Sequence, residues 1–512
     1  MPYPRMPSLD QLRRDAKSLK KAFETGDAHA RARVASYAAR PGTADLKHAD
    51  FLHVIARENG FESWPKLSWA AETIGLDRAA RQQRLKVALF HGQMWQVEQL
   101  LSETPDLASD QFGLACALYD SDTVLRWLAD DPACATRDFS PRRPMLHLAF
   151  SRYHKVRPDL TASMIVIAEA LVANGANVND TMPTAPDNDH PLSALYGAIG
   201  HADNMVLGRW LLEHGANPND GESLYHATEL GHHEGLKMLL DFGADPTGTN
   251  ALLRAMDFHD HAAVRMLLDH GAQADEFDGS PVGGEAPWVV PALHQAARRG
   301  SDRRMVDMLL DAGADPARVY QGAGVYGYAR VFGNRALAQA LEDRGQTPPL
   351  SREETLMARA ADGQDSPGEF IDPHRLPDAY RNIIHEILHL PGRLEQVKRL
   401  VALGLECDRP DAQGLTPVQM AGWEGPPEVM GYFLSLRPDL GHVNGYGGTL
   451  LSTIMHGSEN CPDRDARDHI ACLRMALENG AAMPRRAAEC AGRADVAEFL
   501  TDWARAYPGQ VV

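Results

Sequence analysis

The chain lacks the features that mark several classes of protein. Its six cysteines, at positions 116, 134, 407, 461, 472 and 490, form no CxxC pair, which argues against a disulfide framework or a structural zinc site. Acidic residues outnumber Lys and Arg by 69 to 51, and the net charge of −18 argues against general nucleic-acid binding. The most continuous apolar stretch, residues 162–173, is about half of the ~20 residues that a membrane span needs.

These absences set the expected environment of the protein. The first residues contain no apolar stretch of the secretory kind, and the scattered cysteines are expected to be buried thiols of a reducing compartment. We therefore expect a cytoplasmic protein with no membrane and no nucleic acid among its partners. With 44% hydrophobic and 23% charged residues, the composition is ordinary for a folded chain.

Charge is distributed unevenly along the sequence. Residues 1–86 contain 16 Lys and Arg against 10 Asp and Glu, a net +6, while the remaining 426 residues carry 35 against 59, a net −24. A basic head on an acidic body suggests separate surfaces and, weakly, intramolecular docking.

The most informative feature is a phrase that occurs six times, each time as the end of an amphipathic helix followed by a glycine, a small residue and a polar turn. At 512 residues the chain exceeds the size of one compact core, but a stack of repeats has no such limit. Self-similarity at a spacing of a few tens of residues predicts a solenoid. The phrases occupy residues 171–179, 211–219, 239–246, 267–275, 309–316 and 400–408.

Three segments upstream of such phrases read PMLHLA (144–149), PALHQAARRG (291–300) and GLTPVQMAGWEG (414–425). They resemble the Thr-Pro-Leu-His and Ala-Ala-x-x-Gly signatures of ankyrin repeats, and the resemblance covers roughly residues 80–507. It implies an all-α, curved solenoid of about 11–13 helix-turn-helix repeats. Residues 57–65 are similar to a helical leader found on some bacterial multi-repeat ankyrin proteins, which implies a small helical N-terminal cap domain.

The expected domains follow from changes in this pattern. In the N-terminal domain, helices are expected at 9–23 with Ser8 as the cap, near 44–58, and after the segment SWPKL. Two short repeats lie between the insertions 181–190 and 276–290, and insertions in a solenoid commonly mark the binding face. The expected boundaries are 1–78 for the N-terminal domain, 80–138 for helix pairs that open the solenoid, 139–346 for ankyrin repeats, 347–379 for a degenerate segment, and 380–507 for C-terminal repeats.

The ankyrin pattern implies that first helices line the concave side, with two exposed positions one turn apart in each repeat. Two hypotheses fit the charged residues there: a mutually paired, solvated surface, or a recognition patch for a polar ligand or a basic or mixed-charge peptide segment. Acid–base catalysis by His226 and Glu229 is disfavoured because no nucleophile or metal set accompanies them. The candidate binding residues are His226, Glu229, Arg254, Asp257, Gln295, Arg298, Tyr328, Glu386, His389, Trp423 and His456.

The sequence leaves two interpretations of Trp423 open. An aromatic side chain beside polar groups is a candidate anchor for a binding partner, but Trp423 also suits a space-filling role against the preceding repeat.

Two short motifs resemble enzyme signatures, but the residues around each motif do not fit the corresponding active site. His385 and His389 belong to an H-E-x-x-H sequence, yet Pro391 follows at once and no third ligand stands at short spacing, so we expect a structural role and no metal. Residues 322–327 match G-x-G-x-x-G without the surrounding βαβ unit that a nucleotide site requires, and no cofactor is expected.

The sequence therefore predicts a non-enzymatic scaffold that binds a protein partner in its concave groove. The alternative is an enzyme or small-molecule-binding protein that uses polar residues of the groove, with a metal-dependent hydrolase at residues 385–389 as its least favoured form.

Overall fold

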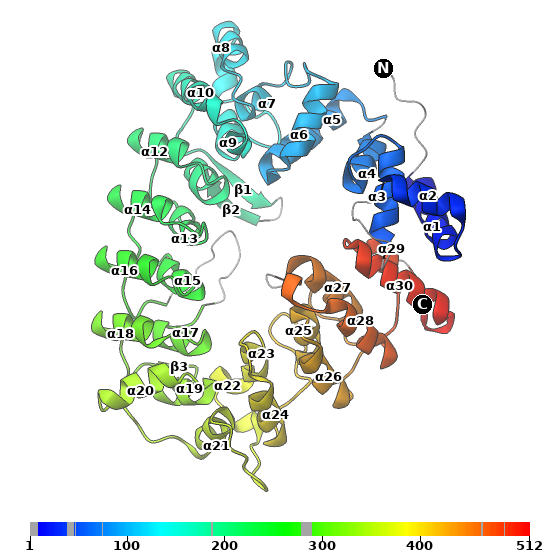
Figure 1. The fold of residues 1–512 in the computed structure, drawn as a ribbon. Coiled ribbons are helices and arrows are strands. Elements are labelled where there is room, and N and C mark those ends of the chain that lie inside the picture. Colours follow the sequence, from blue (N-terminus) through cyan, green and yellow to red (C-terminus); the bar gives the residue numbers. More distant parts are fainter. Residues whose placement is uncertain are drawn as a thin grey trace. The chain divides into compact units, whose positions relative to one another are not determined.

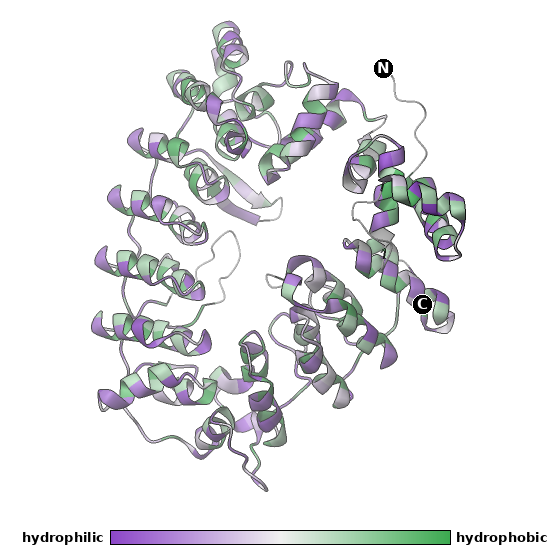
Figure 2. Cartoon of the chain, viewed as in Figure 1, coloured by the Kyte–Doolittle hydropathy of each residue, from purple (hydrophilic) through white to green (hydrophobic). Residues whose placement is uncertain are grey.

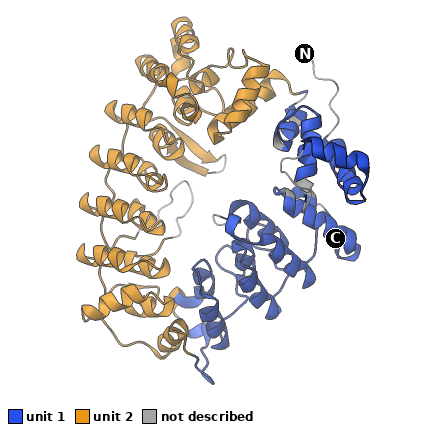
Figure 3. Ribbon diagram, in the orientation of Figure 1, with its two compact units in different colours: residues 1–75, 365–376, 380–512 blue, residues 76–364, 377–379 orange. Residues whose placement is uncertain are grey.

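The structure is a computed structural model that describes residues 9–37, 46, 48–73, 75–185, 188–277, 289–461, 464–485 and 487–512. The chain forms two compact units (Figure 3). Unit 1 combines residues 1–75, 365–376 and 380–512, so it joins the beginning of the chain to its end. Unit 2 contains residues 76–364 and 377–379.

The N-terminal part of unit 1 is a small helical bundle. Leu12, Leu19, Phe51 and Leu67 are buried in its core, and the first two belong to a helix whose apolar residues recur at helical spacing. The helices expected in this region are confirmed, while Ser8 and residues 44 and 45 lie outside the described residues. The helices are α1 (Leu9–Glu24), α2 (Ala28–Tyr37), α3 (His48–Glu58) and α4 (Trp64–Thr73).

Unit 2 is built from consecutive helix pairs (Figure 1). Its α-helices are α5 (Arg78–His91), α6 (Met94–Glu103), α7 (Phe112–Ala117), α8 (Ser121–Asp130), α9 (Pro144–Ala149), α10 (Thr161–Ala173), α11 (Ala194–Tyr196), α12 (Met205–Glu213), α13 (Ser223–Ala227), α14 (Glu234–Asp241), α15 (Ala251–Asp257), α16 (His261–Asp269), α17 (Ala292–Arg298), α18 (Arg303–Asp311), α19 (Val325–Phe332), α20 (Arg335–Asp343) and α21 (Arg352–Ala361). Short 3-10 or π turns are η1 (Pro132–Ala135), η2 (Tyr153–Lys155), η3 (Pro158–Leu160) and η4 (Gly197–His201).

The pairs of unit 2 stack in two layers. First helices contact first helices in the order α13, α15, α17 and α19, and second helices contact second helices in the order α12, α14, α16, α18 and α20. Many second helices begin at an Asp or Asn whose side chain accepts a hydrogen bond from a backbone N–H of the first turn, as Asn204, Asp260, Asp302 and Asn334 do. Figure 2 shows hydrophilic and hydrophobic residues interspersed along these helices, as amphipathic packing requires.

The rest of unit 1 continues the helix-pair pattern. Within it, α25 contacts α27, and α26 contacts α28. At the end of the chain, α30 packs against α3 of the N-terminal bundle. The elements are η5 (Pro373–Arg375), α22 (Asp378–Arg381, which begins in unit 2), α23 (Ile383–Ile387), α24 (Leu394–Ala402), α25 (Pro417–Glu424), α26 (Pro427–Ser435), α27 (Leu450–Asn460), η6 (Arg464–Ala466), α28 (His469–Glu478), α29 (Ala487–Cys490), α30 (Ala494–Ala506) and η7 (Pro508–Gln510).

The predicted glycine stops are confirmed. All six repeated phrases place their glycine in the left-handed region, with φ between 86° and 102°, where a residue with a Cβ would be strained. These residues are Gly175, Gly215, Gly243, Gly271, Gly313 and Gly404.

One of the two expected insertions forms a β-hairpin. Strands β1 (Thr181–Ala185) and β2 (Asn188–Ser193) pair antiparallel, with Thr181 opposite Ser193. A second, smaller hairpin joins β3 (Val319–Tyr320) to β4 (Ala323–Gly324). Of the other insertion, residues 278–288 lie outside the described part of the chain. Over the described residues, these two hairpins are the strands of an otherwise helical fold.

Two further properties concern membrane-spanning helices and the cysteines. No helix in the described part of the chain is both long enough and apolar enough to cross a membrane. Cys116, Cys134, Cys461 and Cys472 are buried free thiols, as expected, but Cys407 is only half-buried and Cys490 is exposed.

A close approach of two helices in unit 1 supplies a test of the stacking. A Cβ built on Gly457 of α27 would lie 2.4 Å from the carbonyl oxygen of Trp423 on α25 and 2.7 Å from its Cα. We expect Gly457→Ala to destabilise the protein by about 1–3 kcal/mol through overpacking, although alanine is the better helix former by ~1 kcal/mol. Guanidinium unfolding followed by circular dichroism measures the change.

Gly509→Ala is the matched control, because a Cβ there meets no atom within 4 Å. Its unfolding midpoint should stay with that of the wild type. An unchanged midpoint in Gly457→Ala would contradict the close contact of α25 with α27.

Candidate binding surface

The candidate surface lies on successive first helices of unit 2. Helices α13, α15 and α17 pack side by side, so polar residues near the end of each helix lie next to those of its neighbour. Hydrogen bonds and ion pairs join these residues into one network, which also includes a residue of the β1–β2 hairpin. We name it the unit 2 polar network and define it as His190, Glu222, His226, Glu229, Arg254, Asp257, Gln295, Arg298 and Arg299.

A buried carboxylate anchors one end of the network. Glu222, which is only 1% exposed, lies at the start of α13. Its carboxylate contacts Nε2 of His190 from strand β2 and, at 3.2 Å, Nε2 of His226 one helical turn on. A buried charge requires such partners, because its desolvation is otherwise costly.

Glu229 and Arg254 continue the network between repeats. The Oε2 atom of Glu229 lies 2.9 Å from Nδ1 of His226, and its Oε1 atom accepts a hydrogen bond of 2.9 Å from Nε of Arg254. Arg254 in turn donates from Nη1 to Asp257 over 3.0 Å, and its guanidinium carbon lies 4.8 Å from the ring centre of Phe258. Both Glu229 and Arg254 keep close to 30% of their side-chain surface exposed.

Asp257 connects the network to the next repeat. Its Oδ1 atom accepts hydrogen bonds from Nε2 of Gln295 at 2.6 Å and from Nε of Arg299 at 2.7 Å. Arg298 donates to Oε1 of the same glutamine at 2.8 Å. The charged groups of this surface are therefore paired with one another over three repeats, and the choice between a solvated surface and a recognition patch stays open.

The network changes the protonation of its histidine. Burial lowers the pKa of His226, but hydrogen bonds to Glu222 and Glu229 and their negative charges outweigh burial, so the pKa rises to about 9. Burial likewise opposes ionisation of Glu229, yet His226 and Arg254 hold its pKa below the ordinary value. His226 is therefore protonated near neutral pH and does not suit the role of a general base.

Three of the candidate residues are not exposed as expected. Gln295 is 0% exposed, Arg298 is 2% and Tyr328 is 1%. Gln295 and Arg298 form the hydrogen bonds just described. The ring of Tyr328 packs against the rings of His294 and Phe332, with ring centres 4.9 and 4.1 Å away. The assumption that these positions face solvent was wrong, because neighbouring side chains of the stack cover them.

The second predicted patch is only partly assembled. In unit 1 the ring of Trp423 lies 5.1 Å from the ring of His456, and Asn460 contacts Nδ1 of the same histidine at 2.9 Å. Trp423 is half-buried and His456 is exposed. Glu386 is half-buried on α23, and His389 lies beyond the end of that helix. Trp423 thus packs against a residue of the following repeat, whereas the predicted space-filling role was against the preceding one, and its role as a binding anchor stays a prediction.

The H-E-x-x-H sequence does not form the arrangement that a metalloprotease needs. Helix α23 ends at Ile387, so His385 and His389 do not share one helical face. His385 is buried, and its Nε2 atom donates to the carbonyl oxygen of Leu415 in the next repeat at 3.0 Å. His294 makes the equivalent bond to Ala323 at 3.1 Å, so these histidines have a structural role.

Sequence reasoning missed Glu222, His190 and Arg299. Glu222 precedes α13, outside the two positions per repeat that the pattern selects, and His190 belongs to an insertion. The one indication in the sequence that these residues could join the site was that the insertion 181–190 lies beside the short repeats.

The protonation of His226 yields a prediction. Its folded-state pKa of about 9 lies above the ordinary value of 6.5, so its stabilising contribution is complete below pH 6.5 and is lost as pH rises through 9. Between pH 7 and pH 10, the free energy of unfolding should fall by on the order of 2 kcal/mol more in the wild type than in His226→Gln. Urea unfolding at several pH values measures both profiles.

Arg265→Gln is the control, since it removes an exposed cation of α16 that lies outside the unit 2 polar network. Its pH profile should run parallel to that of the wild type. Parallel profiles for His226→Gln would contradict the proposed ionisation.

Comparison with known proteins supports the architecture. Residues 195–278 match a family model described as ankyrin repeats (3 copies), and residues 291–319 match the model of a single ankyrin repeat. No curated protein sequence matches significantly.

Three similar solved structures are ankyrin repeat domains. That of human ASB11 is 21% identical, with a TM-score of 0.33, and the match covers 47% of this chain and 99% of the other. For Bcl-3, a member of the IkappaB protein family, identity is 20%, the TM-score is 0.33 and the match covers 45% and 97%. A domain from Acinetobacter baumannii is 22% identical, with a TM-score of 0.30 and coverage of 38% and 98%. The stacked helix pairs, the glycine stops and the two family-model matches together make this chain an ankyrin repeat protein with an all-α solenoid fold.

Proposed function

We propose that the protein is a non-enzymatic, cytoplasmic scaffold and that the unit 2 polar network binds a mixed-charge segment of a partner protein. Ankyrin repeats are in general protein–protein interaction modules. The observation that carries the proposal is the continuous chain of paired polar groups from strand β2 to α17, with Glu229 and Arg254 still partly exposed.

The geometry favours binding because the exposed groups are already fixed. Arg254 is held by Glu229, by Asp257 and by the ring of Phe258. A side chain that is ordered before binding loses little conformational entropy when a partner arrives. The short first helices add to this, because each is immobilised by its neighbours in the stack.

The charges indicate what kind of segment fits. The network contains three carboxylates, and these face protonated His226 and the guanidinium groups of Arg254 and Arg299. Because neither sign prevails at the exposed groups, a segment with both acidic and basic residues matches them better than one of a single sign. In unit 1, we propose Trp423 and His456 as a second, smaller contact area, since a half-buried aromatic ring is a common binding anchor.

The test compares two arginines of one repeat. A partner captured by the immobilised full chain is purified, and its affinity is measured by calorimetry. Arg254→Gln should weaken binding roughly tenfold, since it removes a fixed charged donor at the centre of the surface. Arg265→Gln, an equal change on the exposed side of α16, should leave binding unchanged.

Glu229→Gln supplies a second measurement, because it removes a carboxylate and leaves Arg254 in place. It should also weaken the binding of a mixed-charge partner. Circular dichroism verifies that each variant is folded. Equal affinity in all three variants would place the binding surface elsewhere.

A further inference from the structure

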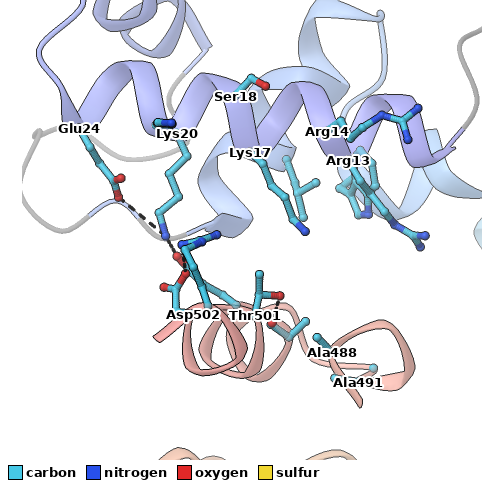
Figure 4. Close-up of a pocket in the computed structure, with 17 residues that line it drawn as sticks. Arg13, Arg14, Lys17, Ser18, Lys20, Glu24, Ala488, Ala491, Thr501 and Asp502 are labelled. Carbon is cyan, nitrogen blue, oxygen red and sulfur yellow. Dashed lines mark hydrogen bonds and ion pairs between the residues drawn. The ribbon is translucent and has the colours of Figure 1, made fainter. Parts of the chain in front are cut away.

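A large cavity in unit 1 has a charge opposite to that of the molecule as a whole. It measures about 1340 Å³ and lies between α1 on one side and the α29–α30 segment on the other (Figure 4). Six cationic and three acidic side chains line it, although the chain carries a net charge of −18. Five of the cations come from α1: Arg13, Arg14, Lys17, Lys20 and Lys21.

Three of these cations form a row along one helix. Arg13, Lys17 and Lys21 follow each other at intervals of four residues, so they project from the same side of α1 and are exposed. Residues Leu12, Ala16 and Leu19 bury the other side of this helix in the bundle core, which fixes the row in orientation. At 1.5 Å per residue, neighbouring charges of the row are about 6 Å apart and the row spans about 12 Å.

The acidic groups of the cavity pair with cations other than Lys17 and Lys21. Glu498 and, at 3.9 Å, Glu24 pair with Lys20, and Asp502 pairs with Arg505 at 2.9 Å. Lys17 and Lys21, in contrast, have no acidic partner in the part of the chain that the structure describes. Figure 4 shows Lys17 reaching from α1 toward the opposite wall.

The opposite wall combines small apolar residues with paired charges. Ala488, Ala491 and Ala497 line the cavity on the α29–α30 side, beside Thr501 and the ion-paired carboxylates of Glu498 and Asp502. The two walls therefore differ: one carries a straight row of positive charge, and on the other the alanines leave room for small uncharged side chains between groups that are already paired.

We propose that this cavity binds an extended acidic peptide segment of a partner protein, with acidic side chains at every second position and small apolar residues between them. In an extended chain, alternate side chains point to opposite sides and those on one side are about 6.6 Å apart. That spacing matches the ~6 Å between charges on α1 and lets the intervening residues face the alanines. The volume also exceeds the roughly 300–1,000 Å³ of ordinary small-molecule pockets. This site is independent of the unit 2 polar network, for which we propose a mixed-charge segment.

Fluorescence anisotropy with the full chain tests the assignment. The probe is a labelled eight-residue peptide in which aspartate alternates with alanine, measured at near-physiological salt. We expect saturable binding that weakens at least fivefold in Lys17→Glu/Lys21→Glu and becomes weaker as salt is raised. A peptide of the same composition with its four aspartates in one block should bind less well, because only half of its carboxylates face α1.

Arg265→Glu/Arg304→Glu is the matched control, since it reverses two exposed charges on second helices of unit 2. It should bind the probe like the wild type. Lys17→Gln/Lys21→Gln, checked by circular dichroism, should also weaken binding and covers the case that charge reversal disturbs α1. The proposal is overturned if the probe does not bind, if both lysine variants bind it unchanged, or if inorganic tripolyphosphate displaces it at lower concentration than the unlabelled peptide does.

Discussion

Packing between neighbouring helix pairs is the interaction on which the structure depends, because its first helices are too short to be stable alone. Helix α13 has five residues and α15 has seven, whereas an isolated helix needs roughly 12–15 to persist in water. Each pair must therefore bury its apolar side against the next. Small residues at the contacts, such as Gly457 against Trp423, let the backbones approach closely.

The same constraint explains how isolated polar residues become one surface. Stacking places adjacent first helices about 8–10 Å apart, a distance that a long side chain can bridge. Arg254 does so, since it reaches Glu229 in the preceding repeat and Asp257 on its own helix. A buried network of this kind is stable only when its members are paired, which links the ionisation of His226 to the integrity of three repeats.

The sequence was most informative where the pattern is local. Glycine stops and amphipathic spacing predicted the helices, and the two positions selected in each repeat included Glu229 and Arg254, which form an ion pair between neighbouring repeats. The sequence did not predict burial that depends on a neighbouring repeat, as at Tyr328. It also did not predict the contact between His190 and Glu222, because that contact requires the β1–β2 hairpin. The cavity of unit 1 could not be predicted from the sequence, because α1 and α30 are separated by nearly the whole chain. The basic N-terminal region gave only a weak indication of intramolecular docking. In the structure, Lys20 of α1 pairs with Glu498 of α30.

Unit 1 unites residues 1–75 with the end of the chain, while unit 2 is almost continuous in sequence. During synthesis on the ribosome, the bundle of residues 9–73 therefore emerges before unit 2 but meets α30 only after unit 2 has been made. Unit 2 has all of its repeats available well before that moment, and domains generally fold as they emerge. Translation should thus separate folding into two stages, with the nascent bundle lacking its neighbour α30 until residues 494–506 have been synthesised.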